Sequence, residues 1–141
     1  ERFQRELREW AARQQEAEAR GDALETRNCR ALAERARRWL ARLEGLPKGP
    51  TYPFQFTLHR LGDAIWATSG GEPYSLIQTE LRRRFPQYTL LFSPLSSDFQ
   101  VAYLLPRDRY GKGLYQEEPS SLAPGCLELL IEAMAGRISA L

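Results

Sequence analysis

The sequence FQFTLHRLGDAIWATSGGEPY, residues 54–74, marks the point where the chain changes from helix-forming to strand-forming composition. Apolar and polar side chains alternate over residues 54–61, which predicts a strand. The Gly-Asp pair at 62–63 is typical of a tight turn, and the apolar run 64–68 predicts a second strand, so the two strands form a hairpin. The glycine-rich stretch 69–73 predicts a sharp turn after that hairpin.

Downstream of this turn a helix and further strands are expected. Residues 74–85 place apolar side chains on one helical face, and Pro86 stops the helix. Apolar runs at 88–92 and 99–105 predict two more strands, with a polar loop between them. The helix therefore lies between two pairs of predicted strands.

The C-terminal part begins with a long loop and ends in a helix. Residues 106–119 are rich in glycine, tyrosine and charge and predict an irregular loop, a kind of segment that often carries function. Residues 120–141 predict the last helix, with Pro124 in its first turn. Its expected core face consists of Leu127, Leu130, Ile131, Met134 and Ile138. The order strand, strand, helix, strand, strand, helix predicts an α+β fold with two helices packed on a small mixed sheet.

Two amphipathic helices are expected upstream, at residues 1–20 and 23–44, where strong helix formers dominate. Between them, Gly21 is expected to end the first helix and Asp22 to cap the second. Such a short joint predicts an antiparallel helical hairpin.

A linker separates the hairpin from the rest of the chain, because residues 45–53 hold two glycines and three prolines. We therefore expect a helical hairpin over residues 1–46 and an α+β unit over residues 47–141. The chain opens at Glu1 in sequence typical of the middle of a helix, so we expect a further segment upstream.

Composition limits the classes of function. With 141 residues, 43% hydrophobic and 27% charged, the chain is not disordered as a whole. The net charge of +2 gives no argument for nucleic acid. No run approaches the roughly 20 apolar residues of a membrane-spanning helix, so no transmembrane segment is expected, and no compartment is indicated. Cys29 and Cys126 lack the spacing of a redox or zinc site; two buried thiols is the simpler interpretation, and a disulfide stays open.

Glu72 is the first candidate for chemistry. It lies between a predicted strand and a predicted helix, where functional groups are common in sheet proteins and where a helix N-terminus stabilises a carboxylate. The alternative is that Glu72 is only a first-turn acid beside Pro73.

Three tyrosines form the second candidate group: Tyr103, Tyr110 and Tyr115 fall within thirteen residues. A phenol can bind a metal, donate a hydrogen bond to an oxyanion or orient a carbonyl group. The alternative is that tyrosine is simply suited to half-buried strands and loops.

These residues belong to motifs whose order and spacing are similar to those of a known family. The motifs are LGDAIW at 61–66, GGEPY at 70–74, AYLLPRDRY at 102–110 and YQ at 115–116. Together they resemble the C-terminal part of the neutral/alkaline ceramidases and their bacterial relatives. The likeness covers about residues 53–141, and the preceding hairpin resembles an insert of the bacterial relatives.

The resemblance implies a zinc amidase that hydrolyses an N-acyl amide bond, which in the bacterial relatives need not be that of ceramide. In the family, two histidines of the N-terminal part bind the metal together with a glutamate and a tyrosine of this part. Glu72 and Tyr103 fall on those two metal ligands, and Tyr115 falls on a tyrosine that contacts the substrate amide. The implied partners are therefore the histidine-bearing N-terminal part and a lipid-like acyl-amide substrate, and the chain alone is expected to be inactive.

Several positions depart from the family pattern. Gly70 replaces a proline, Asp98-Phe99-Gln100 replaces an asparagine–tyrosine pair, and Ala102 replaces a glycine. These changes bear on substrate choice and on metal retention. The single histidine, His59, matches neither family ligand, so we expect an ordinary strand histidine there.

A different class of function is a non-catalytic interaction domain. In that hypothesis the helical hairpin docks a protein partner through the face that carries Trp10 and Trp39.

Overall fold

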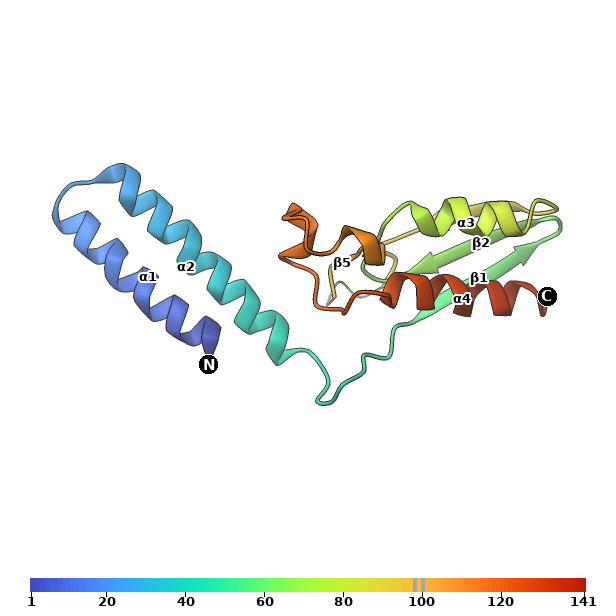
Figure 1. Cartoon of the computed structure of the whole chain (residues 1–141), viewed down its shortest axis with the longest axis horizontal. Helices are drawn as coiled ribbons and strands as arrows, with labels where there is room; N and C mark the ends of the chain where they lie inside the picture. Colours follow the sequence, from blue (N-terminus) through green and yellow to red (C-terminus); the bar gives the residue numbers. More distant parts are fainter. Residues whose placement is uncertain (98, 100) are drawn as a thin grey trace. The chain divides into compact units, whose positions relative to one another are not determined.

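The structure, a computed structural model, describes residues 1–97, 99 and 101–141 of the chain. It divides into two compact units, Glu1–Pro50 and Thr51–Leu141, which are described separately below (Figure 1). Two helices that pack together precede a small mixed sheet with further helices, so the predicted α+β class is confirmed.

The first unit is the helical hairpin, with α1 at Arg2–Ala19 and α2 at Ala23–Glu44 running antiparallel (Figure 1). Gly21 takes the left-handed conformation, with φ of 70°, that ends many helices. The Asp22 carboxylate accepts a hydrogen bond of 3.0 Å from the Glu25 amide and thereby caps α2. The turn therefore forms as its two residue types predict.

Small side chains and one aromatic pair make the seam between α1 and α2. The rings of Phe3 and Trp39 stack with centroids 5.0 Å apart. The fully buried side chains are Ala17, Cys29, Ala33 and Ala36. These small residues let the two helix backbones approach closely.

The second unit contains a three-stranded sheet in the order β1, β2, β4, formed by Phe56–Leu61, Ala64–Ser69 and Thr89–Ser93. Strand β2 is antiparallel to β1 and parallel to β4, so the sheet is mixed. Helix α3, Leu76–Arg84, connects the two parallel strands. A parallel pair needs such a crossover connection.

The rest of this unit consists of short elements and one longer helix. Strand β3, Glu72–Pro73, pairs in parallel with β5, Tyr103–Leu104. Two 3₁₀ turns follow, η1 at Arg107–Arg109 and η2 at Tyr115–Glu117. Helix α4, Cys126–Ile138, comes last.

The helices cover one face of the three-stranded sheet. Ile65 and Ala67 of β2 are fully buried, whereas Trp66 between them is 43% exposed. All five predicted core residues of α4 are buried. An ion pair of 2.7 Å between Arg84 and Glu132 joins α3 to α4. The core of the second unit therefore lies between this pair of helices and the inner face of the sheet.

Two local predictions are wrong, and a third is incomplete. Of the described residues in the expected strand 99–105, only Tyr103–Leu104 form a strand, and the left-handed Ala102 interrupts the extended backbone before them. The predicted turn at 69–73 is present, but it ends in a short strand, Glu72–Pro73, which the sequence did not reveal because its partner lies 31 residues downstream. Helix α4 begins at Cys126, after the left-handed Gly125, so Pro124 precedes its first turn.

Two further predictions concern the membrane and the cysteines. Within the described residues, no helix has the length and apolar character needed to cross a bilayer. Cys29 and Cys126 are both free thiols. Burial, and then the adjacent Glu25 carboxylate, raise the pKa of Cys29.

Candidate functional site

The site is built where the parallel strand β2 ends. The chain turns at Gly71, whose φ is 59°, and an added Cβ atom there would lie 2.9 Å from the carbonyl oxygen of Ala102. The Glu72 amide donates a hydrogen bond of 2.7 Å to that same oxygen. Only glycine allows this turn and this close approach of two backbones without strain. The turn therefore places Glu72 beside the strand that carries Tyr103.

Glu72 and Tyr103 are register partners of the parallel pair β3–β5. Register partners of neighbouring strands point to the same side of a sheet, so their side chains meet. Burial, the negative charge of Glu72 and a hydrogen bond between the two side chains all raise the pKa of Tyr103. The phenol is thus held neutral as a donor to the carboxylate.

Tyr115 joins this pair from the loop that follows β5. Its ring meets the ring of Tyr103 edge-on, with centroids 6.2 Å apart, while 74% of its surface remains exposed. The three residues singled out in the sequence thus form one group that is open to solvent. A carboxylate, a phenol and a second phenol in this arrangement can bind a cation and donate hydrogen bonds to a polar ligand.

Tyr110 supports the site from outside it. Its hydroxyl lies 3.2 Å from the hydroxyl of Ser120 and donates at 3.2 Å to the carbonyl oxygen of Leu122. The Ser120 hydroxyl in turn donates at 2.8 Å to the carbonyl oxygen of Tyr103. Ser120 therefore ties the loop to β5, a role that the sequence analysis missed, because a serine that bonds a distant backbone atom has no sequence signature.

Ala102 adopts a conformation that favours glycine, with φ of 51° while its side chain is buried. The ceramidase resemblance implies a glycine at this position. Of the other positions that depart from that resemblance, Asp98 and Gln100 lie outside the described residues, and Gly70 is buried in the turn before Glu72. The backbone at 102 thus takes a glycine-like shape although the residue is alanine.

Two oxygen donors lie together at this site. Zinc in proteins is usually held by four ligands, drawn from cysteine, histidine and carboxylate. Glu72 and Tyr103 bring two oxygen donors together, yet no three His, Cys, Asp or Glu residues gather as a metal cluster in the described part of the chain. His59 is exposed on β1 with its ring 5.6 Å from that of Trp66, as expected of an ordinary strand histidine. The remaining ligands would have to come from another segment.

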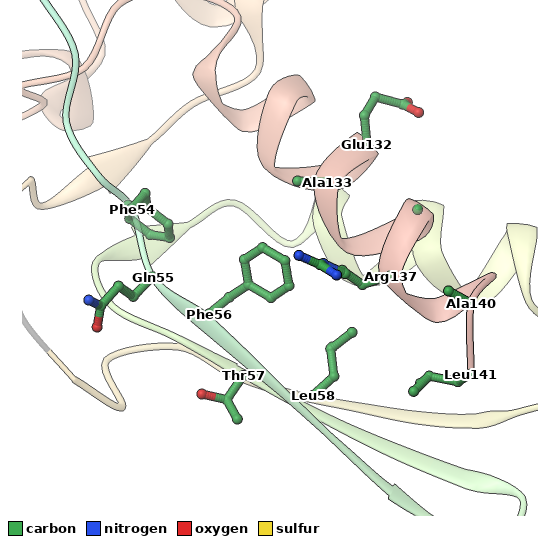
Figure 2. A pocket seen from close by; sticks show the side chains of 11 residues that line it. Phe54, Gln55, Phe56, Thr57, Leu58, Glu132, Ala133, Arg137, Ala140 and Leu141 are labelled. Atoms are coloured by element: carbon green, nitrogen blue, oxygen red, sulfur yellow. The ribbon is translucent and has the colours of Figure 1, made fainter.

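A separate groove lies between β1 and α4, with a cavity volume of about 1030 Å³. Figure 2 shows Phe56 and Leu58 of β1 facing Ala133 and Arg137 of α4 across it. None of Glu72, Tyr103 and Tyr115 lines this groove. The groove and the tyrosine–glutamate group are therefore different surfaces of the second unit.

Comparison of the chain with protein-family models, curated proteins and solved structures gives no match.

Proposed function

We propose that the chain is the C-terminal segment of a zinc-dependent, ceramidase-like amidase that hydrolyses an N-acyl amide bond. The observation that supports this proposal most directly is the pairing of Glu72 with Tyr103 on adjacent strands. The family motifs name the same two residues as metal ligands, and they lie far apart in the sequence. If Glu72 and Tyr103 each had only a structural role in their own segment, nothing would require their side chains to lie side by side.

In this proposal Glu72 and Tyr103 hold zinc together with two histidines of the N-terminal part of the protein. Bound zinc in such a set lowers the pKa of water and polarises a carbonyl group. The Glu72 carboxylate supplies negative charge, and the phenol of Tyr103 supplies a weaker oxygen ligand. The two side chains already lie side by side, and the phenol proton that faces Glu72 would leave on binding of the ion.

Tyr115 acts on the substrate in the same proposal. Its hydroxyl donates a hydrogen bond to the scissile amide and orients it beside the Glu72–Tyr103 pair. The large exposed surface of its ring also suits contact with an apolar acyl group. We therefore propose a lipid-like acyl amide as substrate.

The proposal is tested in a longer chain that includes the histidine-bearing part. Glu72→Ala and Tyr103→Phe should each lower zinc content and amidase activity, measured by atomic absorption and by release of amine. Tyr88→Phe is the matched control, because Tyr88 lies under the guanidinium of Arg60, away from the proposed site. Full activity and full zinc content in Glu72→Ala would contradict the assignment.

A second candidate function is a protein-interaction domain that uses the helical hairpin. It is favoured by the half-buried state of Trp10 and by the exposure of Leu24 and Leu43. The stacking of Trp39 on Phe3 weighs against it, because Trp39 already contributes to the seam between α1 and α2. Deletion of residues 1–46 from the longer enzyme tests this second function. If the shortened protein keeps its activity but no longer binds a protein partner, the hairpin is an interaction domain.

A further inference from the structure

The loop before Tyr115 is closed by one carboxylate. Glu117 accepts hydrogen bonds from the amides of Gly111 at 2.7 Å, Lys112 at 3.0 Å and Leu114 at 2.9 Å. The first bond uses Oε2 and the other two use Oε1, so both carboxylate oxygens are occupied. Hydrogen bonds to an ionised acceptor are stronger than neutral ones. The backbone of residues 111–114 is therefore wrapped around a single charged side chain.

These hydrogen bonds also favour the charged form of Glu117. Hydrogen bonds from four backbone amides lower the pKa of Glu117, and burial opposes them. In order of decreasing effect, these amides belong to Leu114, Gly111, Lys112 and Gly113. The carboxylate consequently stays ionised at neutral pH. Its geometry and its charge thus act together on the same loop.

A tyrosine lies at each end of the loop 111–114, next to the candidate site. At one end, Tyr110 is fixed through its hydroxyl to Ser120. At the other end, Tyr115 directly follows Leu114, whose amide is bound to Glu117, and its ring meets Tyr103. Because Tyr115 is largely exposed, packing alone does little to hold its ring in place.

We propose that Glu117 is a positioning residue that closes the loop 111–114 and thereby holds Tyr115 against Tyr103. The use of that position for an acyl-amide substrate rests on the function proposed above. The structural part of the inference, that the loop and the ring depend on Glu117, stands on the hydrogen bonds alone. Glu117→Gln removes one acceptor position, because an amide carries one oxygen and one donor nitrogen.

The two lysines of the chain, Lys48 and Lys112, provide a test with an internal control. A lysine-specific protease should cleave the exposed linker after Lys48 at the same rate in all variants. Cleavage after Lys112 should be about tenfold faster in Glu117→Gln than in the unaltered chain, because the loop opens more often. Glu16→Gln, which removes an exposed carboxylate of α1, should leave both rates unchanged. An unchanged Lys112 rate in Glu117→Gln would overturn the inference.

The ring contact is tested separately by NMR. In Glu117→Gln the Overhauser contact between the rings of Tyr103 and Tyr115 should weaken or vanish. Tyr115→Ala should leave cleavage after Lys112 slow, because the carboxylate and not the tyrosine closes the loop. A retained ring contact in Glu117→Gln, or fast cleavage after Lys112 in Tyr115→Ala, would refute the positioning role.

A third readout connects the loop to catalysis. In the longer chain, Glu117→Gln should lower kcat/KM as much as Tyr115→Ala does and leave zinc content unchanged, whereas Glu72→Ala should remove zinc. Unchanged kcat/KM would overturn the catalytic part of the inference. Proteolysis and NMR need no catalysis, so they decide the role of Glu117 even if the amidase proposal fails.

Discussion

Burial and the neighbouring Glu72 carboxylate together lower the acidity of the Tyr103 phenol. Besides burial, the Glu72 carboxylate raises the pKa of Tyr103 through its charge and this bond. Glu72→Gln should therefore lower the pKa of Tyr103 towards the ordinary tyrosine value, because the neutral amide no longer repels the phenolate. The ¹³C shift of the Tyr103 Cζ atom, followed through an alkaline titration, measures the change.

Glu16→Gln serves as the control in that titration and should leave the pKa of Tyr103 where it is. An equal pKa in Glu72→Gln and the unaltered chain would mean that the two side chains do not interact.

The left-handed backbone at Ala102 makes a second prediction. An alanine in this conformation is strained by about 1–2 kcal/mol, which offsets the methyl group and chain entropy lost on mutation to glycine. Ala102→Gly should therefore change the free energy of unfolding by less than about 0.5 kcal/mol, whereas Ala67→Gly in the buried strand β2 should lower it by about 1–2 kcal/mol. Urea denaturation measures both, and equal losses would show that position 102 is unstrained.

Residues in recognisable motifs could be proposed for the candidate site from the sequence, and residues that bind the backbone could not. Glu72, Tyr103 and Tyr115 were proposed from motif order, and the structure places them side by side. Ser120 and Glu117 bond backbone atoms whose positions depend on the path of the loop. That path is set by tertiary contacts and leaves no periodic pattern.

Helix α2 depends on its cap at Asp22. Asp22→Ala removes the acceptor for the Glu25 amide and should lower the stability of the hairpin by about 1 kcal/mol. Asp22→Asn keeps an acceptor oxygen and should cost only a few tenths of a kcal/mol, by the same ranking of cap residues. Exchange of the Glu25 amide with deuterium measures both; equal exchange in the two variants would contradict the cap.

The loop 111–114 should depend on pH. The backbone amides hold the pKa of Glu117 below its usual value. A lowered pKa in the folded state means that the carboxylate contributes its full stabilisation above the usual glutamate pKa and loses it as pH falls through the lowered value. The protection factor of the Gly111 amide, which is its exchange rate relative to the intrinsic rate at the same pH, should therefore fall only at acidic pH. A fall in this protection that begins near neutrality would point to a different group.

At the scale of elements, long patterns were predicted well and short ones poorly. The helices α1, α2 and α3 and the strands β1, β2 and β4 lie where periodicity places them, within about two residues. Strands β3 and β5 have two residues each, too few to display any alternation. They exist because Gly71 lets two backbones meet, which is a property of tertiary structure.

The whole chain separates at the linker. Residues 45–50 form neither helix nor strand, and Lys48 is exposed there. Cleavage after Lys48 should therefore leave residues 49–141 folded, because the core of the second unit is made by its own sheet and helices. A heteronuclear NMR spectrum of that fragment should overlay on the spectrum of the intact chain. Collapse of its dispersed signals would show that the hairpin is required for the second unit to fold.

The fold class could be predicted because the two units differ in composition. Glutamate, arginine and alanine dominate before the linker, and β-branched and aromatic residues are frequent after it. The partner segments that the proposed zinc site requires cannot be predicted from these residues. The resemblance assigns only two oxygen ligands to these residues, Glu72 and Tyr103, and they carry no pattern that indicates where further ligands lie.

The crossover from β2 through α3 to β4 has a consequence for the route by which the second unit folds. These elements lie within residues 64–93, so their mutual contacts close short loops, whereas α4 must return from residues 126–138. Short loops close with a smaller entropy loss, and contacts of low sequence separation form early. A nucleus of β2, α3 and β4 would therefore assemble first, and α4 would dock in a later step. Before α4 docks, the turn that precedes Glu72 has formed, but Tyr103 and the loop after it have no fixed position beside Glu72.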